Sequence, residues 1–405
     1  MSSVASGLIS PPQAKPSLRT PHMVTRSLSI THFGPYPPNY GGVSVHIRRL
    51  HLRLLRLGWK SSVITPPGFP AFPETGVSVA RRFRRRYHWL RYPGIPIPGE
   101  VAHCHDCWVH LSWVLCRLLV QGKALVITVH NQQDARRWST AGVDRRLGAR
   151  LLARVPRVRW IAVNLTVREQ LIARGVRSGQ IEVIPAFLAP AREDSNPAAL
   201  PPSVFEFLAT HQPALSMYGS KYDFVDGVDL YGFDLAVEAL AALKAGCPRA
   251  GLVICVPANS QLDYQPELAR RATQLGCSES IFFLNEGVPD ASELWRRSSV
   301  HLRPTVTDGD SLAVREALAL GVPVAASDAA PRPPGCLQFP SRNLEAFVKA
   351  IQSALESPPR LPSDADTDSQ AHFQAILRQY LHARLRGSDP VGEHTLGAAA
   401  TVKRL

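Results

Sequence analysis

Short strand-like segments alternate with helix-like segments along most of this chain, and this alternation constrains its fold more than any other feature. In the first half, four apolar or alternating runs are typical of strands: residues 26–31, 61–65, 124–129 and 159–163. Between the first two runs, an apolar stripe from Val43 to Leu57 has helical spacing, and Gly58 would end that helix. A strand–loop–helix–strand order predicts a parallel sheet, so the predicted fold class is α/β.

The same alternation restarts after a Pro-rich stretch, which predicts two domains in series. A length of 405 residues also favours two or three domains. We expect two doubly wound, Rossmann-like domains that face each other across a cleft, where the carboxyl ends of the strands bind ligands. The predicted boundaries are a flexible tail at 1–26, a first domain at 27–190, a linker at 191–213, a second domain at 214–368, a helix at 369–386 that packs back towards the first domain, and a frayed tail at 387–405.

The net charge of +14 is divided unevenly between the two halves. Residues 1–190 hold 27 Lys and Arg against 7 Asp and Glu, whereas residues 191–405 hold 19 against 25. A generally Arg-rich composition would not explain the acidic second half. We therefore predict that the first half faces a polyanion, which could be nucleic acid, an anionic membrane surface or a phosphate-bearing substrate.

Membrane spans and secretion signals are not expected. No segment reaches the roughly 18 uncharged apolar residues of a membrane span, and the first 25 residues contain no apolar core of a signal peptide. The seven cysteines, an odd number in a long chain, fit reduced thiols. These features predict a cytoplasmic protein.

The segment Thr307–Asp328 is the richest in candidate chemistry. Asp308 and Glu316 are carboxylates eight positions apart, and Asp310 or Ser311 would cap the helix that carries Glu316. The unpaired backbone amides from Gly309 to Leu312 would suit a phosphate, and Glu316 could accept hydrogen bonds from sugar or ribose hydroxyls. An ordinary capped helix with a surface glutamate is the alternative.

This segment resembles the E-x7-E region of the retaining glycosyltransferases of family 4 (group 1 glycosyl transferases), which have the GT-B fold. Asp308 and Glu316 occupy its two acidic positions, and the following residues to Asp328 match the family's run. Other stretches resemble the family in the same order: Gly41-Gly42-Val43 with His46, Val101–Asp106, Val126–Asn131, Ile161–Gly175 and Ile181–Pro185.

The resemblance implies that a nucleotide-sugar donor binds the second domain and that its glycosyl group passes, with retention, to an acceptor hydroxyl bound by the first. Glu316 would hold the donor ribose and Asp308 the hydroxyls of the transferred sugar, beside His130. Preorganised amides would stabilise the departing diphosphate. The implied donor-binding set is Gly41, Gly42, Ser220, Lys221, Arg303, Gly309, Asp310, Ser311, Leu312 and Glu316, and the implied acceptor-side set is His46, His105 and Asn131. No cofactor and no metal are expected.

Two departures from the family pattern concern the donor site. Asp308 is one methylene shorter than the glutamate that the family usually has. Tyr231 stands where the family has a diphosphate-binding lysine, and Ser220-Lys221 stands near the position of its arginine. Lys221 or Arg303 could supply the missing charge. The alternative is a weakly active or inactive GT-B protein that acts as a partner or glycan-binding subunit. A nucleotide-sugar epimerase, which can share the fold, is another.

The run from His103 to Cys107, with His110, also invites comparison with a zinc site. A structural zinc site usually needs a second ligand pair at a set spacing, and the sequence has no second C-x-x-C. We therefore predict a strand edge with alternating small residues and without a metal. The resemblance implies, as an alternative, that the histidines face the cleft.

Arginines interleave with aromatic residues between Arg81 and Arg91. This pattern is seen in proteins that bind single-stranded nucleic acid and in proteins that bind membrane surfaces. No nucleic-acid-binding fold accompanies it, so no nucleic-acid partner is expected. Residues 142–155 predict an amphipathic helix with a stripe of Val143, Leu147, Leu151 and Val155, which we expect to pack in the core. The basic first domain would suit a glycan or lipid-linked acceptor in polysaccharide, exopolysaccharide or glycolipid synthesis, with the protein peripheral on the inner face of the cell membrane.

Overall fold

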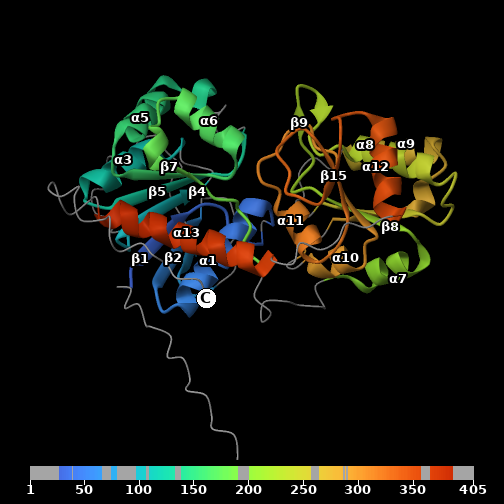
Figure 1. Cartoon of the computed structure of the whole chain (residues 1–405), viewed down its shortest axis with the longest axis horizontal. Helices are drawn as coiled ribbons and strands as arrows, with labels where there is room; N and C mark the ends of the chain where they lie inside the picture. The colour runs from blue at the N-terminus through green and yellow to red at the C-terminus, as the bar shows by residue number, and fades with distance from the viewer. Residues whose placement is uncertain are drawn as a thin grey trace, which may run out of the picture.

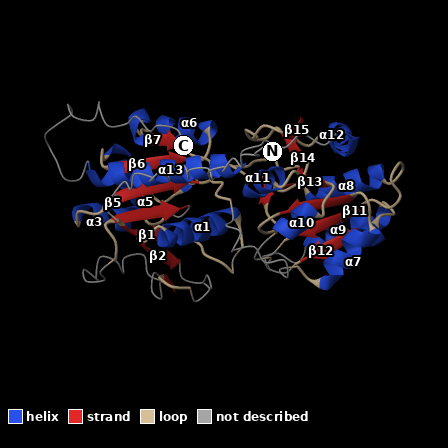
Figure 2. Ribbon diagram, turned by 60° about the horizontal axis from the view of Figure 1, so that its bottom comes forward, coloured by secondary structure: helices blue, strands red, loops and turns tan. Residues whose placement is uncertain are grey.

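The computed structural model describes residues 27–38, 40–65, 74–79, 97–105, 109–132, 138–189, 200–256, 264–285, 288, 291–356 and 365–385. These residues form two α/β domains, each built on a parallel sheet with helices on both faces (Figures 1 and 2). The predicted fold class is therefore confirmed. The Arg-rich run between Arg81 and Arg91 lies outside the described residues.

The first sheet has seven strands in the order β3-β2-β1-β4-β5-β6-β7, and every pair is parallel. Its strands are β1 (Ser29–Phe33), β2 (Lys60–Thr65), β3 (Val77–Val79), β4 (Val101–His105), β5 (Ala124–Val129), β6 (Val158–Ala162) and β7 (Ile181–Val183). Strand order reverses direction at β1, as in doubly wound sheets, so the loop after β1 lies at the switch point.

The second sheet has six strands in the order β12-β11-β8-β13-β14-β15, again all parallel. They are β8 (Ala214–Tyr218), β11 (Gly251–Cys255), β12 (Ile281–Leu284), β13 (Val300–Arg303), β14 (Val324–Ser327) and β15 (Cys336–Phe339). A short antiparallel hairpin, β9 (Phe224–Val225) and β10 (Val228–Asp229), follows β8. The sequence pattern did not predict β13, β15 or this hairpin, which are two to four residues long.

Helices fill the connections. The first domain carries α1 (Gly42–Arg56), α3 (Ser112–Val120), α5 (Val143–Arg154) and α6 (Leu165–Ala173). The second carries α7 (Pro202–Thr210), α8 (Phe233–Leu243), α9 (Tyr264–Gln274), α10 (Ser292–Arg296), α11 (Leu312–Ala319) and α12 (Leu344–Glu356). Within the described residues, no helix combines the length and the apolar character needed to cross a membrane.

Helix α7 lies within the predicted linker at 191–213. Pro202 occupies the first turn, where its missing N–H costs nothing, and Val204 and Leu208 are buried against the second sheet with Ala214 and Leu284. This part of the predicted linker therefore belongs to the second domain.

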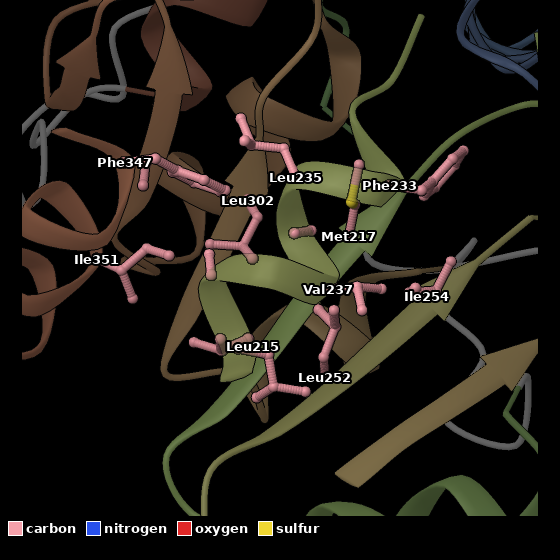
Figure 3. Close-up of a cluster of buried hydrophobic side chains, with 14 of the residues drawn as sticks. Leu215, Met217, Phe233, Leu235, Val237, Leu252, Ile254, Leu302, Phe347 and Ile351 are labelled. Carbon is pink, nitrogen blue, oxygen red and sulfur yellow. The ribbon is translucent and has the colours of Figure 1, made fainter. Parts of the chain in front are cut away.

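A continuous apolar core lies between α8, α12 and the second sheet. Figure 3 shows Leu215, Met217 and Leu302 of the sheet meeting the helical side chains of Val237 and Phe347. These side chains are nearly inaccessible to water, so their burial supplies most of the favourable free energy of this domain.

Helix α13 (Ala365–Leu385) follows the second domain along the chain but packs on the first, where it lies across β4, β5 and β6 (Figure 1). Ile376 and Tyr380 are buried against Leu50 and Val126. The Tyr380 hydroxyl also lies 2.7 Å from His103 Nδ1. The first domain is therefore completed by residues from the end of the chain.

We expect the substitution Ile376→Ala to lower the free energy of unfolding by about 2–5 kcal/mol, because it leaves a cavity where α13 meets the first sheet. Urea denaturation followed by tryptophan fluorescence would measure the change. The matched control is Gln374→Ala, on the exposed face of the same helix, with an expected change within about 0.5 kcal/mol. Equal effects of the two substitutions would show that α13 does not contribute to this core.

Candidate functional site

A buried ion cluster holds the loop after β13, which carries the first predicted carboxylate. Asp308 Oδ2 accepts hydrogen bonds from Arg303 Nε and Arg332 Nη1, each at 2.8 Å, and Oδ1 accepts one from Arg303 Nη2 at 3.0 Å. Burial opposes ionisation of Asp308, but the two guanidinium groups outweigh it and hold the pKa of this carboxyl well below its usual range. Asp308 is thus an anion at neutral pH and fixes the loop.

Glu316, the second predicted carboxylate, projects from α11 and binds groups of both domains. Its Oε2 accepts a hydrogen bond from Trp295 Nε1 at 3.2 Å. Its Oε1 lies 2.6 Å from Nη2 of Arg49, which belongs to α1 of the first domain. Arg49 also donates to the Leu188 carbonyl oxygen at 3.0 Å. Arg49 thus pairs with the carboxylate that, by the resemblance, would bind the ribose of the donor.

The loop between these carboxylates lies directly against the first domain. The Gly309 carbonyl oxygen accepts a hydrogen bond from Asn164 Nδ2 at 3.1 Å, and Asp310 Oδ2 accepts one from the Ala186 amide at 2.8 Å. A Cβ atom on Gly309 would lie 2.0 Å from the carbonyl oxygen of His130, so only glycine fits here. Because β5 ends just before His130 and β13 ends before the loop, the carboxyl edges of the two sheets meet here.

The helix start and the glycine-rich loop face each other across the same contact. Ser311 is the N-cap of α11, and its hydroxyl accepts a hydrogen bond from the Val314 amide, so Ser311 and not Asp310 caps this helix. Gly41 caps α1 and Gly42 is its first residue. Cβ atoms on these glycines would lie 3.5 Å from Ser220 Cβ and 3.8 Å from Leu312 Cβ. Two helix N-termini, each with a positive dipole end, therefore lie at one place.

The predicted cationic residues already have partners. Arg303 stacks over the ring of Tyr231, with its guanidinium carbon 5.1 Å from the ring centroid, and donates to the Tyr218 carbonyl oxygen. The Tyr231 hydroxyl lies 2.7 Å from Ser220 Oγ. Lys221 forms a half-exposed ion pair with Asp223 at 2.8 Å. The tyrosine in the place of the family lysine thus supports Arg303 beside the site.

The predicted residues of the first domain meet at the same edge. His105 ends β4, and its Nδ1 lies 3.1 Å from Nε2 of His130. His46, on α1, is buried with its ring centroid 5.2 Å from that of His130. Asn131 adjoins His130 and lies beside Gly309. His110, which the sequence placed next to the zinc-like run His103–Cys107, instead contacts Arg145. Asp106 and Cys107 lie outside the described residues.

Sequence reasoning did not identify four residues that organise the site: Arg49, Asn164, Trp295 and Arg332. Asn164 was detectable as a residue type, because it caps α6 with its own side chain and asparagine is a favoured N-cap. The others carry no local signal, because their partners lie far away in the sequence.

Two Rossmann-like domains that meet at the carboxyl ends of their strands define the GT-B class. Sequence models of two families match consecutive parts of the chain: Glycosyltransferase Family 4 matches residues 40–192, and Glycosyl transferases group 1 matches residues 226–357. The chain therefore belongs to the family 4, group 1 glycosyltransferases, and the predicted resemblance is confirmed. Comparison with curated protein sequences gives no match.

Solved structures share the fold at low sequence identity. Sucrose-phosphate synthase from Thermosynechococcus elongatus is 16% identical, with a TM-score of 0.62 over 89% of this chain and 97% of that one. Anabaena Alr3699/HepE, solved with UDP and glucose, is 14% identical, with a TM-score of 0.60 over 89% and 98%. Trehalose 6-phosphate synthase from Burkholderia multivorans is 16% identical, with a TM-score of 0.60 over 89% and 98%.

We expect Asp308→Asn to destabilise the chain by about 3–5 kcal/mol, because it removes the negative charge between two buried guanidinium groups. Urea denaturation at neutral pH measures this loss. The control is Asp223→Asn, which breaks the exposed pair with Lys221 and should cost at most about 1 kcal/mol. If both variants lost the same small amount, the cluster would not hold the loop.

Proposed function

We propose that this protein transfers a glycosyl group from a nucleotide-sugar donor to an acceptor hydroxyl with retention of anomeric configuration. The observation that carries the proposal is the meeting of Glu316 and the loop Asp308–Leu312 with Gly41, Gly42 and His130 at the facing edges of the two sheets. Membership of a glycosyltransferase family supports it, as does a fold shared with HepE, which has been solved with UDP and with UDP-glucose.

In this proposal the diphosphate binds mainly to backbone groups. The first amides of α1 and α11 have no partners within their helices and suit the phosphate oxygens, helped by the helix dipoles. Arg303 is a buried cation, and its stacking on Tyr231 would keep it at the edge of the site. These donors would stabilise the charge that develops on the departing nucleoside diphosphate.

The donor ribose would take the place of Arg49 on Glu316. Ribose hydroxyls would donate to the carboxylate, while Trp295 keeps Oε2 in position from the other side. Donor binding therefore requires the Arg49–Glu316 pair, which joins the two domains, to separate.

A donor screen tests the proposal. A panel of nucleotide sugars should include at least one that raises the melting temperature, since a ligand of the folded state stabilises it by mass action. With that donor, Glu316→Gln should lower kcat/KM at least about tenfold, because a hydrogen bond to a charged group contributes about 1.5–3 kcal/mol. NMR of the product gives its anomeric configuration.

Glu345→Gln is the control, because Glu345 forms only an exposed ion pair with Lys349. An inverted product would contradict retention alone. Failure of every donor to bind at millimolar concentration would contradict the transferase proposal.

Two observations favour a second candidate, a GT-B protein that binds a partner or a glycan without turnover. Both predicted carboxylates are engaged by arginines, and Tyr231 replaces the expected lysine. This candidate predicts glycan binding or a stable complex with a glycosyltransferase, with no product from any donor.

We further propose that the acceptor is lipid-linked and that the protein docks on an anionic membrane through α5, as in polysaccharide or glycolipid assembly. The expected core packing is wrong for three residues of the α5 stripe, since Val143, Leu147 and Leu151 are 74%, 50% and 43% exposed, whereas Val155 packs partly buried against the core. Arg150 and Arg154 lie on the exposed surface of the same helix. Exposed leucines beside arginines suit an interface that combines apolar insertion with attraction to anionic lipid.

Liposome flotation tests this surface. The double substitution Leu147→Glu with Leu151→Glu should lower binding to anionic vesicles at least about tenfold, since burying one leucine is worth about 1.5 kcal/mol or more. Leu275→Glu, at an exposed leucine of the second domain, should have no effect. Equal recovery on neutral and anionic vesicles would refute an electrostatic dock.

A further inference from the structure

Five histidines are buried together in the first domain, although they come from four different elements. Each is at most 7% exposed. They are His32 of β1, His46 of α1, His103 and His105 of β4, and His130 after β5. Burial lowers the pKa of each of the first four, that of His46 to about 3, so these imidazoles are neutral at physiological pH. The resemblance places His46, His105 and His130 beside the proposed transferase site and gives no role to His32 and His103.

One of the five has a purely structural role. His103 Nδ1 lies 2.7 Å from the Tyr380 hydroxyl, and His103 Nε2 lies 2.7 Å from Thr128 Oγ1. Both ring nitrogens of His103 are therefore occupied, so it has no lone pair to offer.

His46 differs, because only one of its nitrogens has a partner. Its Nδ1 lies 2.6 Å from the Ala186 carbonyl oxygen, which can only accept, so Nδ1 carries the proton. Nε2 is then a bare lone pair, and it is buried without a hydrogen-bond partner. A buried polar atom without a partner is costly, so it indicates a ligand that completes the site.

His105 and His130 provide two more nitrogens next to it. The candidate ligand atoms of His46, His105 and His130 all lie within 4.8 Å of one another. The closest pair, His105 Nδ1 and His130 Nε2, is 3.1 Å apart. Two nitrogens bound to one tetrahedral metal ion at about 2.0–2.1 Å are about 3.3 Å apart. This pair, which shares a hydrogen bond, is therefore close to ligand spacing.

We propose that His46, His105 and His130 bind one divalent transition-metal ion, with zinc the expected species. Three imidazole ligands leave a fourth position for water or a substrate oxygen, as in zinc sites that are not purely structural. The surrounding contacts fit: the Ala186 carbonyl orients His46, and His32 Nδ1 lies 3.4 Å from His105 Nε2, which can donate to it. The site shares His130 with the proposed transferase site, but metal binding is measured without a sugar donor, so the two proposals can fail separately.

Direct metal binding tests the proposal without any sugar donor. The full chain is stripped with EDTA, equilibrated with Zn²⁺, passed through a gel-filtration column and analysed for metal. We expect about one equivalent of zinc per chain, and visible ligand-field bands of a tetrahedral complex when Co²⁺ is used instead.

His46→Gln and His105→Gln should each weaken zinc binding by more than about tenfold. The controls are His51→Gln and His301→Gln, which replace histidines outside the trio and should leave binding unchanged. Circular dichroism establishes that each variant is folded. If the ligand variants do not fold, the proposal is still tested by the amount of zinc bound per wild-type chain and by whether zinc raises the melting temperature of the wild-type protein. The absence of bound zinc, or equal binding in ligand variants and controls, would overturn the proposal.

Discussion

The contact between the two domains depends on the buried ion cluster of Arg303, Asp308 and Arg332. Burying these charges is costly unless each is paired and hydrogen-bonded, and here the carboxylate accepts from both guanidinium groups. A loop fixed in this way can contact the first domain through its backbone rather than through flexible side chains. Gly309 then approaches the His130 carbonyl more closely than any other residue type could. The ion cluster and this glycine thus allow the loop to lie directly against the first domain.

Much of the fold was predictable because its signals are local. The apolar stripe from Val43 to Leu57, followed by Gly58, predicts both ends of α1 to within two residues. Gly58 has the positive φ that its predicted role at the helix end requires. Helix α5 shows where local signals fail. Its Val143, Leu147 and Leu151 stripe is exposed because α3 packs on the smaller residues instead: a Cβ on Gly148 would lie 2.7 Å from Ser112 Oγ. Hydrophobicity identified an amphipathic helix, but close packing decided which face is buried.

The site was less predictable, because its residues acquire their partners only in three dimensions. Sequence spacing placed Asp308 and Glu316 together, yet nothing near them in the chain indicates Arg332 or Arg49. The histidines show the same limit. Zinc patterns in sequence depend on ligands a few residues apart, whereas the trio of His46, His105 and His130 draws one side chain from each of three separate segments. A parallel sheet brings such residues together because its strands all end at one edge.

Glu316 links domain closure to the proposed chemistry, because Arg49 and a donor ribose would compete for the same carboxylate. A donor that binds only when the Arg49–Glu316 pair is broken binds only that fraction of the molecules. Its apparent Kd is therefore its intrinsic Kd divided by the fraction of molecules in which the pair is broken. The same competition would act after transfer, when return of Arg49 to Glu316 favours release of the nucleoside diphosphate. The opposite net charges of the two halves favour closure in general, but under the proposed function this one pair would make closure and donor binding mutually exclusive at the ribose position.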